Sequence, residues 1–528
     1  MRKSREAGAG RGERWGLLLA LLSAVLLILA QPPFHLLLLP FVALTPLATA
    51  LGALAHGRSS GRAAARLGLA FGAVHWGVLL VWVPLVVGPR FPWAYPGYGV
   101  QLGLLGGLAA LMGWATHSIN RRAGVPLPLA FSLAWVAMEW MKAHFPLGLS
   151  FPWLGLGIPL TSWPRLLGLA EWTGEGGVSF WLAAVNGLLA SAVLAATDGR
   201  VGSRALGRPA RLALLAGGVG LVPAILGVLR ANGLPLRAGP TVAVVGTHVP
   251  RTLRLRPAES SEEALAQARE TLGSLRPGSA DLVILPEATV SVPLDQPESG
   301  GYLNTLGEMA KAVEAPILLG ALGTGSPTAL TNSAFLVGLD GSLEARYDKV
   351  RLVPGMEWGE LVPGRPGAPI RVDGFPFGPL ICYESLFGGL ARAQKRAGAK
   401  VLVNLSSDVW FGEGVEGLSA IFLHQHAAHM VMRAVENRTA VARAANGGFS
   451  TLLDPSGRPV AGIVPPTGGL AVASVPVMDG LTLYSRTGDL VGSGATLFCA
   501  LVLGSLALRP RGGRAHREPR KDPERARR

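Results

Sequence analysis

Apolar segments long enough to cross a membrane recur through this chain, and they constrain its fold more than any other feature. A transmembrane helix needs about 20 consecutive, mostly apolar residues. Eight segments meet this requirement: residues 15–31, 34–55, 67–88, 100–117, 126–145, 174–196, 212–232 and 490–508. Only 15% of the residues are charged, against about 25% in an average soluble protein. The pattern predicts a multi-pass α-helical membrane domain of eight spans and excludes disorder, a coiled coil and an ordinary soluble enzyme.

The first apolar segment follows a basic N-terminal stretch, as the core of a cleaved secretory signal would. Ala30-Gln31-Pro32 is a poor cleavage site, and the second apolar segment follows almost at once. We therefore expect an uncleaved helix that forms a hairpin with the second span.

Basic residues cluster in the loops that eight spans would place on one side of the membrane. The clusters lie at the N-terminus, at residues 58–66, 121–122 and 200–211, and in the C-terminal tail. Because Lys and Arg are enriched in cytoplasmic loops, both termini are predicted to be cytoplasmic. The long segment between spans seven and eight then lies on the periplasmic side of a bacterial inner membrane.

Five regions follow from this topology. They are a basic N-terminus (1–14), a membrane domain with spans one to seven (15–235), an extramembrane domain (239–485), the eighth span (488–508) and a basic tail (509–528).

The formal net charge of +15 does not belong to the extramembrane domain. Residues 239–485 contain 19 Lys and Arg and 23 Asp and Glu, so this domain is acidic and the excess positive charge lies in the membrane domain and tails. The charge is therefore a topology signal rather than a binding surface, and it excludes nucleic acid as a partner.

From residue 239 to residue 485 the sequence pattern differs from that of the membrane domain: short apolar runs alternate with amphipathic stretches. This alternation predicts an α/β layered fold. Asn332 is interpreted as a turn signal beside a strand. The strand candidates are 241–246, 281–285, 316–319, 333–338, 379–383 and 400–404, and the helix candidates are 261–275, 304–313, 386–397 and 418–437.

Cys382 ends an apolar strand and directly precedes a helical stretch. A helix N-terminus stabilises a thiolate, so a cysteine at this position can act as a nucleophile. The alternative is a buried structural cysteine, which is common for free cysteines. Cys499, inside the last apolar segment, fits that alternative.

Glu287 and Lys349 are the other two candidates for chemistry. Glu287 follows a buried strand, where partial loss of solvent suits a general base. Lys349 follows a strand–turn–strand unit, and a fixed ammonium there could hold an oxyanion. Read alone, each could equally be a solvated surface residue.

No metal or cofactor is predicted. His424, His426 and His429 do not share one helix face, and no cysteine or acid completes a ligand set with them.

The ordered set Glu287, Lys349 and Cys382 resembles the Glu-Lys-Cys triad of the nitrilase superfamily. The flanking Leu285-Pro-Glu287, Tyr347-Asp-Lys349 and Ile381-Cys-Tyr-Glu384 resemble the three motifs of that family. Further matches are typical of its membrane-bound branch, the apolipoprotein N-acyltransferases: Phe151-Pro-Trp153, Asn404, Asp408, Trp410-Phe-Gly412, His424-Gln-His426, Met432-Arg-Ala434, Glu436 and Arg438.

This resemblance implies an α-β-β-α sandwich and a ping-pong acyl transfer through a Cys382 thioester. The acyl donor would be a membrane phospholipid, and the acceptor the α-amino group of the diacylglyceryl-cysteine of an apolipoprotein. The roles that it implies are catalysis for Glu287, Lys349 and Cys382, support for Glu357, Tyr383 and Glu384, and substrate binding for Trp410 and Phe411. Glu357 would orient Lys349, and Glu384 would hold Lys349 or the substrate amine. A monomer is expected.

The chain departs from the family pattern between Lys349 and Cys382, which are 33 positions apart. In the family this segment is longer and carries a mobile arm over the active site, so we expect a shortened lid. Two other functions remain open. One is a membrane-tethered amide hydrolase with water as the acceptor, and the other is a catalytically inactive scaffold or transporter.

Overall fold

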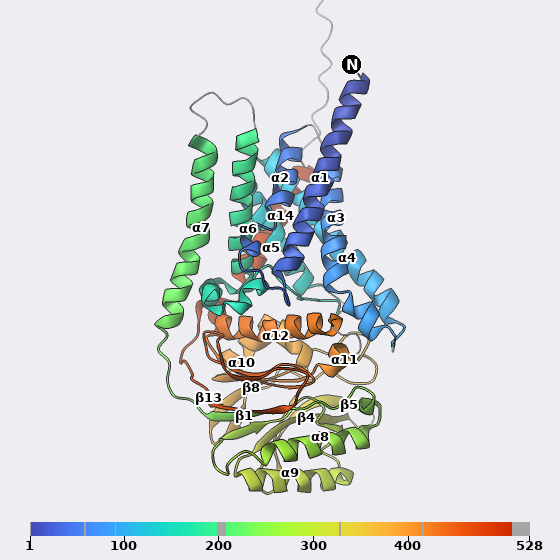
Figure 1. Cartoon of the computed structure of the whole chain (residues 1–528), viewed down its shortest axis with the longest axis vertical. Helices are drawn as coiled ribbons and strands as arrows, with labels where there is room; N and C mark the ends of the chain where they lie inside the picture. The colour runs from blue at the N-terminus through green and yellow to red at the C-terminus, as the bar shows by residue number, and fades with distance from the viewer. Residues whose placement is uncertain are drawn as a thin grey trace, which may run out of the picture.

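A computed structural model describes residues 2–57, 60–89, 91–146, 148–197, 207–326, 329–413 and 417–508, with side chains from residue 14 onward. A bundle of long helices stands on a two-sheet domain, and a helix at the junction lies across the bundle (Figure 1). The first 232 residues and the last helix build the bundle, and residues 241–487 build the two-sheet domain.

The membrane half is almost entirely helical. Its elements are α1 (Arg2–Ala30), η1 (Leu39–Phe41), α2 (Thr45–His56), α3 (Gly61–Leu79), η2 (Val83–Val87), α4 (Ala94–Ala123), α5 (Leu127–Ala143), η3 (Ile158–Ser162), η4 (Pro164–Leu169), α6 (Ala170–Thr197), α7 (Gly207–Asn232) and α14 (Leu490–Leu508).

By length and composition, the described part of the chain shows six candidate spans rather than the eight predicted. They are Leu39–His56, Gly61–Val87, Ala94–Ala123, Pro164–Thr197, Gly207–Asn232 and Leu490–Leu508. Of the other two predicted spans, α5 has 17 residues and begins directly after Pro126, whereas α1 has 29 residues, of which Arg14–Ala30 is the described apolar part. Pro32 follows the end of α1, and proline does not continue a helix.

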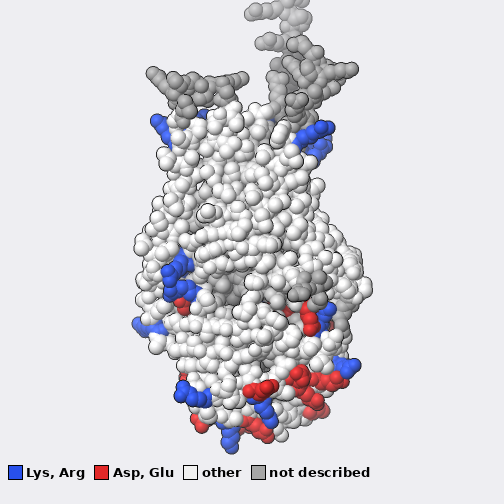
Figure 2. Space-filling view, viewed as in Figure 1, with Lys and Arg blue, Asp and Glu red and all other residues white. Residues whose placement is uncertain are grey.

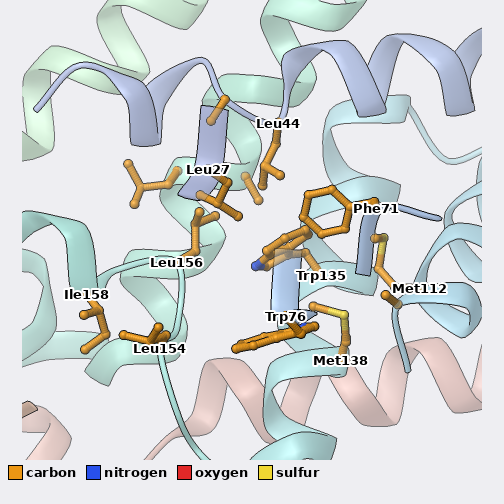
Figure 3. Close-up of a cluster of buried hydrophobic side chains, with 14 of the residues drawn as sticks. Leu27, Leu44, Phe71, Trp76, Met112, Trp135, Met138, Leu154, Leu156 and Ile158 are labelled. Carbon is orange, nitrogen blue, oxygen red and sulfur yellow. The ribbon is translucent and has the colours of Figure 1, made fainter. Parts of the chain in front are cut away.

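Large apolar side chains from several helices meet in one buried cluster inside the bundle. Leu27 of α1, Phe71 of α3 and Trp135 of α5 point toward one another there (Figure 3). The cluster extends to Leu154 and Ile158, in the segment that connects α5 to α6. This connecting segment is therefore fixed by packing against the spans.

The extramembrane domain contains two mixed sheets. The first has the order β13-β1-β2-β4-β5-β6, with β3 paired to β4, and the second has the order β12-β11-β10-β9-β8-β7. The strands are β1 (Thr241–Gly246), β2 (Leu282–Ile284), β3 (Val290–Pro293), β4 (Ile317–Ser326), β5 (Ala329–Val337), β6 (Leu343–Asp348), β7 (Ile370–Val372), β8 (Phe375–Ile381), β9 (Val401–Ser407), β10 (Ala440–Asn446), β11 (Ser450–Leu453), β12 (Pro459–Ile463) and β13 (Gly469–Ser474).

Alternation along the strands makes this domain a four-layer sandwich, because successive side chains of a strand point to opposite faces. In β1, Val242 and Val244 lie in the core between the sheets, whereas Ala243 and Val245 pack against the outer helices. Those outer helices are α8 (Pro257–Leu272) and α9 (Gly300–Val313), and α10 (Gly388–Arg396) and α12 (Leu418–Asn437) cover the other sheet. The short elements are η5 (Leu253–Leu255), η6 (Pro297–Ser299), η7 (Cys382–Leu386), α11 (Val409–Gly412) and α13 (Leu483–Thr487).

The predicted elements of this domain are all present, with shifted boundaries in most cases. The strand at 241–246 and the helix at 418–437 have the predicted bounds. The turn assigned to Asn332 is wrong, because this residue lies inside β5. The strand predicted over 379–383 ends earlier, since Cys382 begins η7.

Helix α12 lies between the two halves of the protein and is buried on nearly every side. Met430 and Ala434 face the second sheet, while Phe422 and Met432 belong to the core of the membrane half. The buried face of α12 also includes polar side chains, among them Gln425, Arg433 and Glu436.

Polar contacts complete this junction. Arg433 Nη2 of α12 donates to Glu175 Oε2 of α6 at 2.6 Å. Arg438, which follows α12, pairs with Glu171 of α6. Trp153 Nε1 donates to Gln425 Oε1 at 2.8 Å. Buried ion pairs require precise partners, so these contacts determine how the two halves are oriented.

Charged side chains are sparse over the helical half on the face that Figure 2 shows, and they gather over the lower part of the sandwich. This distribution matches a belt in contact with lipid. Of the basic residues used for the topology prediction, Arg58, Arg90, Arg200, Arg204 and residues 509–528 lie outside the described residues, as do the side chains of residues 2–13.

Candidate functional site

The three predicted residues follow three different strands and converge where the two sheets meet. Glu287 follows β2, Lys349 follows β6 and Cys382 follows β8. The backbone N–H of Ser407, at the end of β9, donates to Glu287 Oε2 at 2.9 Å. This bond joins the carboxyl ends of strands from both sheets. The fold thus brings Glu287 close to Lys349, which is 62 positions away in the sequence, and to Ser407, which is 120 positions away.

A buried ion cluster forms the centre of the site. Lys349 Nζ lies 3.1 Å from Glu287 Oε1 and 2.9 Å from Glu357 Oε1. The Asn332 amide donates to the same two carboxylate oxygens, at 2.8 and 2.9 Å. Lys349 is 1% exposed. Burial alone would lower the pKa of Lys349, but the two carboxylates hold it well above its ordinary value, so the ammonium stays charged.

Asn332 is the site residue that the sequence interpretation missed. It was taken for a turn residue, yet its amide bridges Glu287 and Glu357 from within β5. An Asn just before an apolar run is an ambiguous pattern, and no local signal marks this residue as part of the site.

Cys382 occupies a strained position next to this cluster. Its φ angle is 49°, in the left-handed region, which costs a non-glycine residue about 1–2 kcal/mol. Such strain is concentrated at functional sites. Burial raises the pKa of the Cys382 thiol, Glu287 raises it further, and Lys349 opposes both. The helical element that begins at Cys382, η7, has only five residues, so the helix N-terminus expected beside the thiol is a single short turn.

A largely apolar cavity of about 360 Å³ opens at Cys382. Its wall is shared by the two halves of the protein. Trp82, Tyr98 and Phe151 come from the membrane half, and Tyr383 and Phe422 come from the sandwich. This volume lies within the usual range for small-molecule sites, about 300–1,000 Å³. The nucleophile candidate therefore faces a space that the spans and the sandwich enclose together.

The segment after Lys349 covers part of this cavity. Val353, Pro354, Gly355 and Met356 line it. A Cβ on Gly355 would lie 3.0 Å from the Trp93 ring of the membrane half, so the segment reaches across the junction. The segment expected to be a shortened lid is thus in contact with the spans.

The two predicted substrate-binding residues lie in different places. Phe411 lines the cavity and packs against Trp82 and Phe422. Trp410 is not part of the described lining; its ring lies near Phe91, and its carbonyl accepts from Arg251. The geometry supports the prediction for Phe411 and not for Trp410, because neighbouring residues of one helical turn point in different directions.

Tyr383 lies on the wall of the cavity and connects the two halves. Its hydroxyl donates to the Ser150 carbonyl at 3.1 Å, and its ring contacts Phe387 edge-on. Burial raises the pKa of Tyr383, so the hydroxyl remains a donor.

Glu384 holds main-chain groups together below the site. Its carboxylate accepts from the Tyr347 hydroxyl at 3.0 Å and from the backbone N–H groups of Val350, Arg351 and Ile381 at 2.7–3.1 Å. These groups join the loop after β6 to the end of β8.

The hydrogen-bond partners of Glu384 among the described residues do not include Lys349, although the Lys349 charge acts on Glu384 and opposes the rise in the pKa of Glu384. The Glu384 side chain is fully buried and outside the cavity lining. It supports the site by fixing the backbone on either side of it.

Glu384 makes stability depend on pH. Burial raises the pKa of Glu384 to about 7, against the lowering effect of its backbone donors, whereas an unfolded Glu titrates near about 4.3. The folded state therefore binds the Glu384 proton more tightly than the unfolded state does. The stability that the protonated side chain contributes is lost as the pH rises from about 4.3 to 7. We expect the melting-temperature difference between the parent and Glu384→Gln, measured in detergent, to fall over this range and stay constant above it. A difference that grows with pH would show that the folded state favours the carboxylate.

Among the described residues, no group of three or more His, Cys, Asp and Glu side chains is placed to hold a metal ion. The three histidines of α12 do not converge on one point, although His426 and His429 both pack against the Trp153 ring. His424 lies against Phe449, His426 bonds to Asp408, and His429 contacts the Trp153 ring.

Together, these features define a carbon–nitrogen hydrolase type of sandwich whose Glu/Lys/Cys site opens toward a membrane domain. Two family models match the chain. Residues 23–188 match the apolipoprotein N-acyltransferase N-terminal domain, and residues 241–479 match carbon-nitrogen hydrolase.

Similar proteins cover nearly the whole chain. An apolipoprotein N-acyltransferase of Geobacter metallireducens is 29% identical and covers 93% of this chain and 95% of its own. An apolipoprotein N-acyltransferase of Bordetella bronchiseptica is 30% identical, and the match covers 97% of this chain and 100% of the Bordetella protein. A solved structure, a mutant of the Nesterenkonia AN1 amidase from the nitrilase superfamily, is 20% identical and covers 47% of this chain and 94% of its own, with a TM-score of 0.36. The chain belongs to the apolipoprotein N-acyltransferase family, within the nitrilase superfamily.

Proposed function

We propose that this protein transfers a fatty acyl chain from a membrane phospholipid to the α-amino group of the N-terminal diacylglyceryl-cysteine of an apolipoprotein. The reaction proceeds in two steps through a thioester on Cys382. Glu287 acts as the base, Lys349 stabilises the oxyanion, and Glu357 orients Lys349.

The observation that carries this proposal is the position of Cys382 at an apolar cavity lined by both halves of the protein. Moving an acyl chain out of a bilayer costs about 0.8 kcal/mol per CH₂. An enzyme that acts on a phospholipid ester must therefore offer apolar surface continuous with the membrane. A cavity with walls from η2, α4 and the sandwich meets this need, whereas a water-soluble amide does not require it.

In the first step, Glu287 takes the proton of the Cys382 thiol, and the sulfur attacks the ester carbonyl of the phospholipid. The carbonyl oxygen becomes an oxyanion, which the Lys349 ammonium stabilises. The intermediate collapses, the C–O ester bond breaks, and the leaving glycerol oxygen takes the proton from Glu287. A lyso-phospholipid leaves and the acyl thioester remains.

In the second step, the α-amine of the lipoprotein attacks the thioester carbonyl and gives up a proton to Glu287. The C–S bond breaks, and the Cys382 sulfur recovers a proton from Glu287. The product is an amide, and the enzyme returns to its starting state. The cavity must exclude water between the two steps, because hydrolysis of the thioester would waste the acyl chain.

We also infer that α1 and α5 cross the membrane, which brings the number of spans to eight. At 1.5 Å per residue, 17 residues extend about 25 Å, close to the hydrocarbon thickness of about 30 Å. Both helices pack inside the bundle. Eight spans leave both termini in the cytoplasm and the sandwich in the periplasm, as the basic loops indicate.

The decisive experiment uses the full-length protein in sealed vesicles that contain phospholipid with a labelled acyl chain. A synthetic diacylglyceryl-cysteine lipopeptide with a free α-amine is added outside. We expect its mass to increase by one acyl group, and an N-acetylated lipopeptide to remain unchanged. Vesicles with the sandwich facing outward should react, and inverted ones should not.

A different product distribution would support the amide hydrolase instead. Labelled free fatty acid formed at the same rate with and without lipopeptide would mean that water is the acceptor. No release of label under either condition would support the inactive scaffold.

A further inference from the structure

A buried polar network lies beside Cys382, and the chemistry proposed above makes no use of it. Its four members come from separate elements: Asn404 from β9, Asp408 from the turn after β9, His426 from α12 and Arg443 from β10. Each is at most 1% exposed. Burying charged groups is costly unless they are paired, and such pairs often add no net stability over apolar residues. A network of this kind therefore calls for a specific role.

Arg443 is the centre of the network. One guanidinium nitrogen donates to Asn404 Oδ1, and Nη2 donates to Asp408 Oδ2 at 2.6 Å. The other oxygen of Asp408 accepts from His426 Nδ1 at 2.9 Å and from Ser406 Oγ at 2.7 Å. Burial alone would raise the pKa of Asp408, but Arg443 and His426 hold it well below its usual range. Asp408 is therefore a constant carboxylate acceptor.

Both ends of the network reach the carbonyl oxygen of Cys382. His426 Nε2 lies 3.3 Å from this oxygen and 3.1 Å from the Ser385 hydroxyl, and Asn404 Nδ2 lies 3.5 Å from the Cys382 oxygen. Asn404 Nδ2 also donates to the Leu380 carbonyl at 3.1 Å. The main chain of the nucleophile is thus bound from two sides by side chains that Arg443 holds in place.

The backbone of Cys382 needs such support because its left-handed conformation is unfavourable for a residue with a Cβ. A peptide relaxed to an ordinary φ would turn the side chain away from the cavity. Of the four network residues, His426 also lines the cavity, so it touches both the nucleophile and the space for the acyl chain.

We propose that Arg443, Asp408, Asn404 and His426 form a positioning network that holds the Cys382 main chain so that its thiol faces the acyl cavity. In this proposal His426 carries a proton on both ring nitrogens, so that Nδ1 donates to Asp408 and Nε2 donates to the Cys382 carbonyl beside the Ser385 hydroxyl. This proposal rests on the function proposed above, since its readout is thioester formation on Cys382.

Two substitutions at position 426 distinguish the contributions of the two ring nitrogens, because each retains only one of the two contacts. Glutamine places an amide nitrogen near the position of Nε2, which faces Cys382, and asparagine places one near Nδ1, which faces Asp408. Loss of a hydrogen bond at a strained nucleophile is expected to slow thioester formation about 30-fold in His426→Asn. His426→Gln should stay within about fivefold of the parent, because the donor to Cys382 is retained.

The measurement is the burst of acylation with labelled phospholipid at saturation, using the full-length protein in detergent micelles. The rate constant of the burst is read from the active molecules alone, since misfolded protein lowers the amplitude and not the rate constant. His429→Gln is the matched control. His429 lies on the same helix, is fully buried and makes no hydrogen bond to the network, although it shares the Trp153 ring with His426 and lies within the electrostatic reach of His426 and Arg443.

A slow His426→Asn beside a fast His426→Gln and a fast His429→Gln would support the proposal. Equal rates in the two His426 variants, or a faster rate in His426→Asn, would overturn it. A parent protein that shows no acylation burst would contradict the proposed function instead, so the two failures are distinguishable.

Discussion

Replacing Cys382 with alanine is expected to abolish the acyl-enzyme. With labelled phospholipid, the parent protein should carry a hydroxylamine-sensitive acyl group, and Cys382→Ala should carry none. Loss of a nucleophile that forms a covalent intermediate lowers the rate by about 10⁴-fold or more. Cys382→Ser should be equally inactive, because a buried hydroxyl is harder to deprotonate than a thiol that is already difficult to ionise. Intact-protein mass spectrometry measures the label directly.

The second cysteine is the natural control for this experiment. Cys499 is buried in α14 and is not part of the cavity lining. Cys499→Ala should therefore acylate at the parent rate. A label that persists in Cys382→Ala, or one that disappears in Cys499→Ala, would contradict the assignment of the nucleophile.

Replacing Lys349 with methionine is expected to damage both catalysis and stability. The ammonium lies between Glu287 and Glu357, and its removal leaves the buried Glu287 and the partly buried Glu357 sharing the Asn332 amide. Removing one partner of a buried ion cluster costs about 3–5 kcal/mol. Loss of an oxyanion-stabilising group lowers the rate of acyl transfer by about 10²–10³-fold. The melting temperature and the acylation burst report the two effects separately.

A double variant distinguishes catalysis from charge balance. Lys349→Met/Glu357→Gln removes one of the two unpaired carboxylates, so it should recover part of the lost stability. It should not recover the acylation rate, because the oxyanion still lacks its cation. If the rate returns together with the stability, Lys349 serves as a counter-ion and the proposed oxyanion role is wrong.

Local patterns in the sequence were enough to find the main elements of the sandwich. The strand at residues 241–246 and the helix at 418–437 have their predicted bounds. Apolar periodicity sets these elements because it reflects which side of each element is buried. The same periodicity found the helix of the fifth predicted span, which begins directly after Pro126 and has 17 residues.

The composition of the site was predicted only in part. Glu287 and Lys349 meet in the structure, with Cys382 beside them, but Asn332 was interpreted as a turn residue, and the backbone donors that Glu384 binds were not foreseen. Asn and Glu make the same local patterns in many surroundings. What they do is decided by the strands that lie opposite them.

The sequence by itself determined that this chain has two halves of opposite character, one for lipid and one for an α/β core. Hydropathy and charge decide this, because partition between water and lipid depends on composition over about 20 residues. Only the tertiary structure decided what the two halves make together. Phe411 and Trp410 are neighbours in sequence, yet Phe411 lines the cavity and Trp410 is not part of the described lining. The wall of the cavity is built by contacts between residues hundreds of positions apart. Long-range packing fixes such contacts, and no local pattern encodes them.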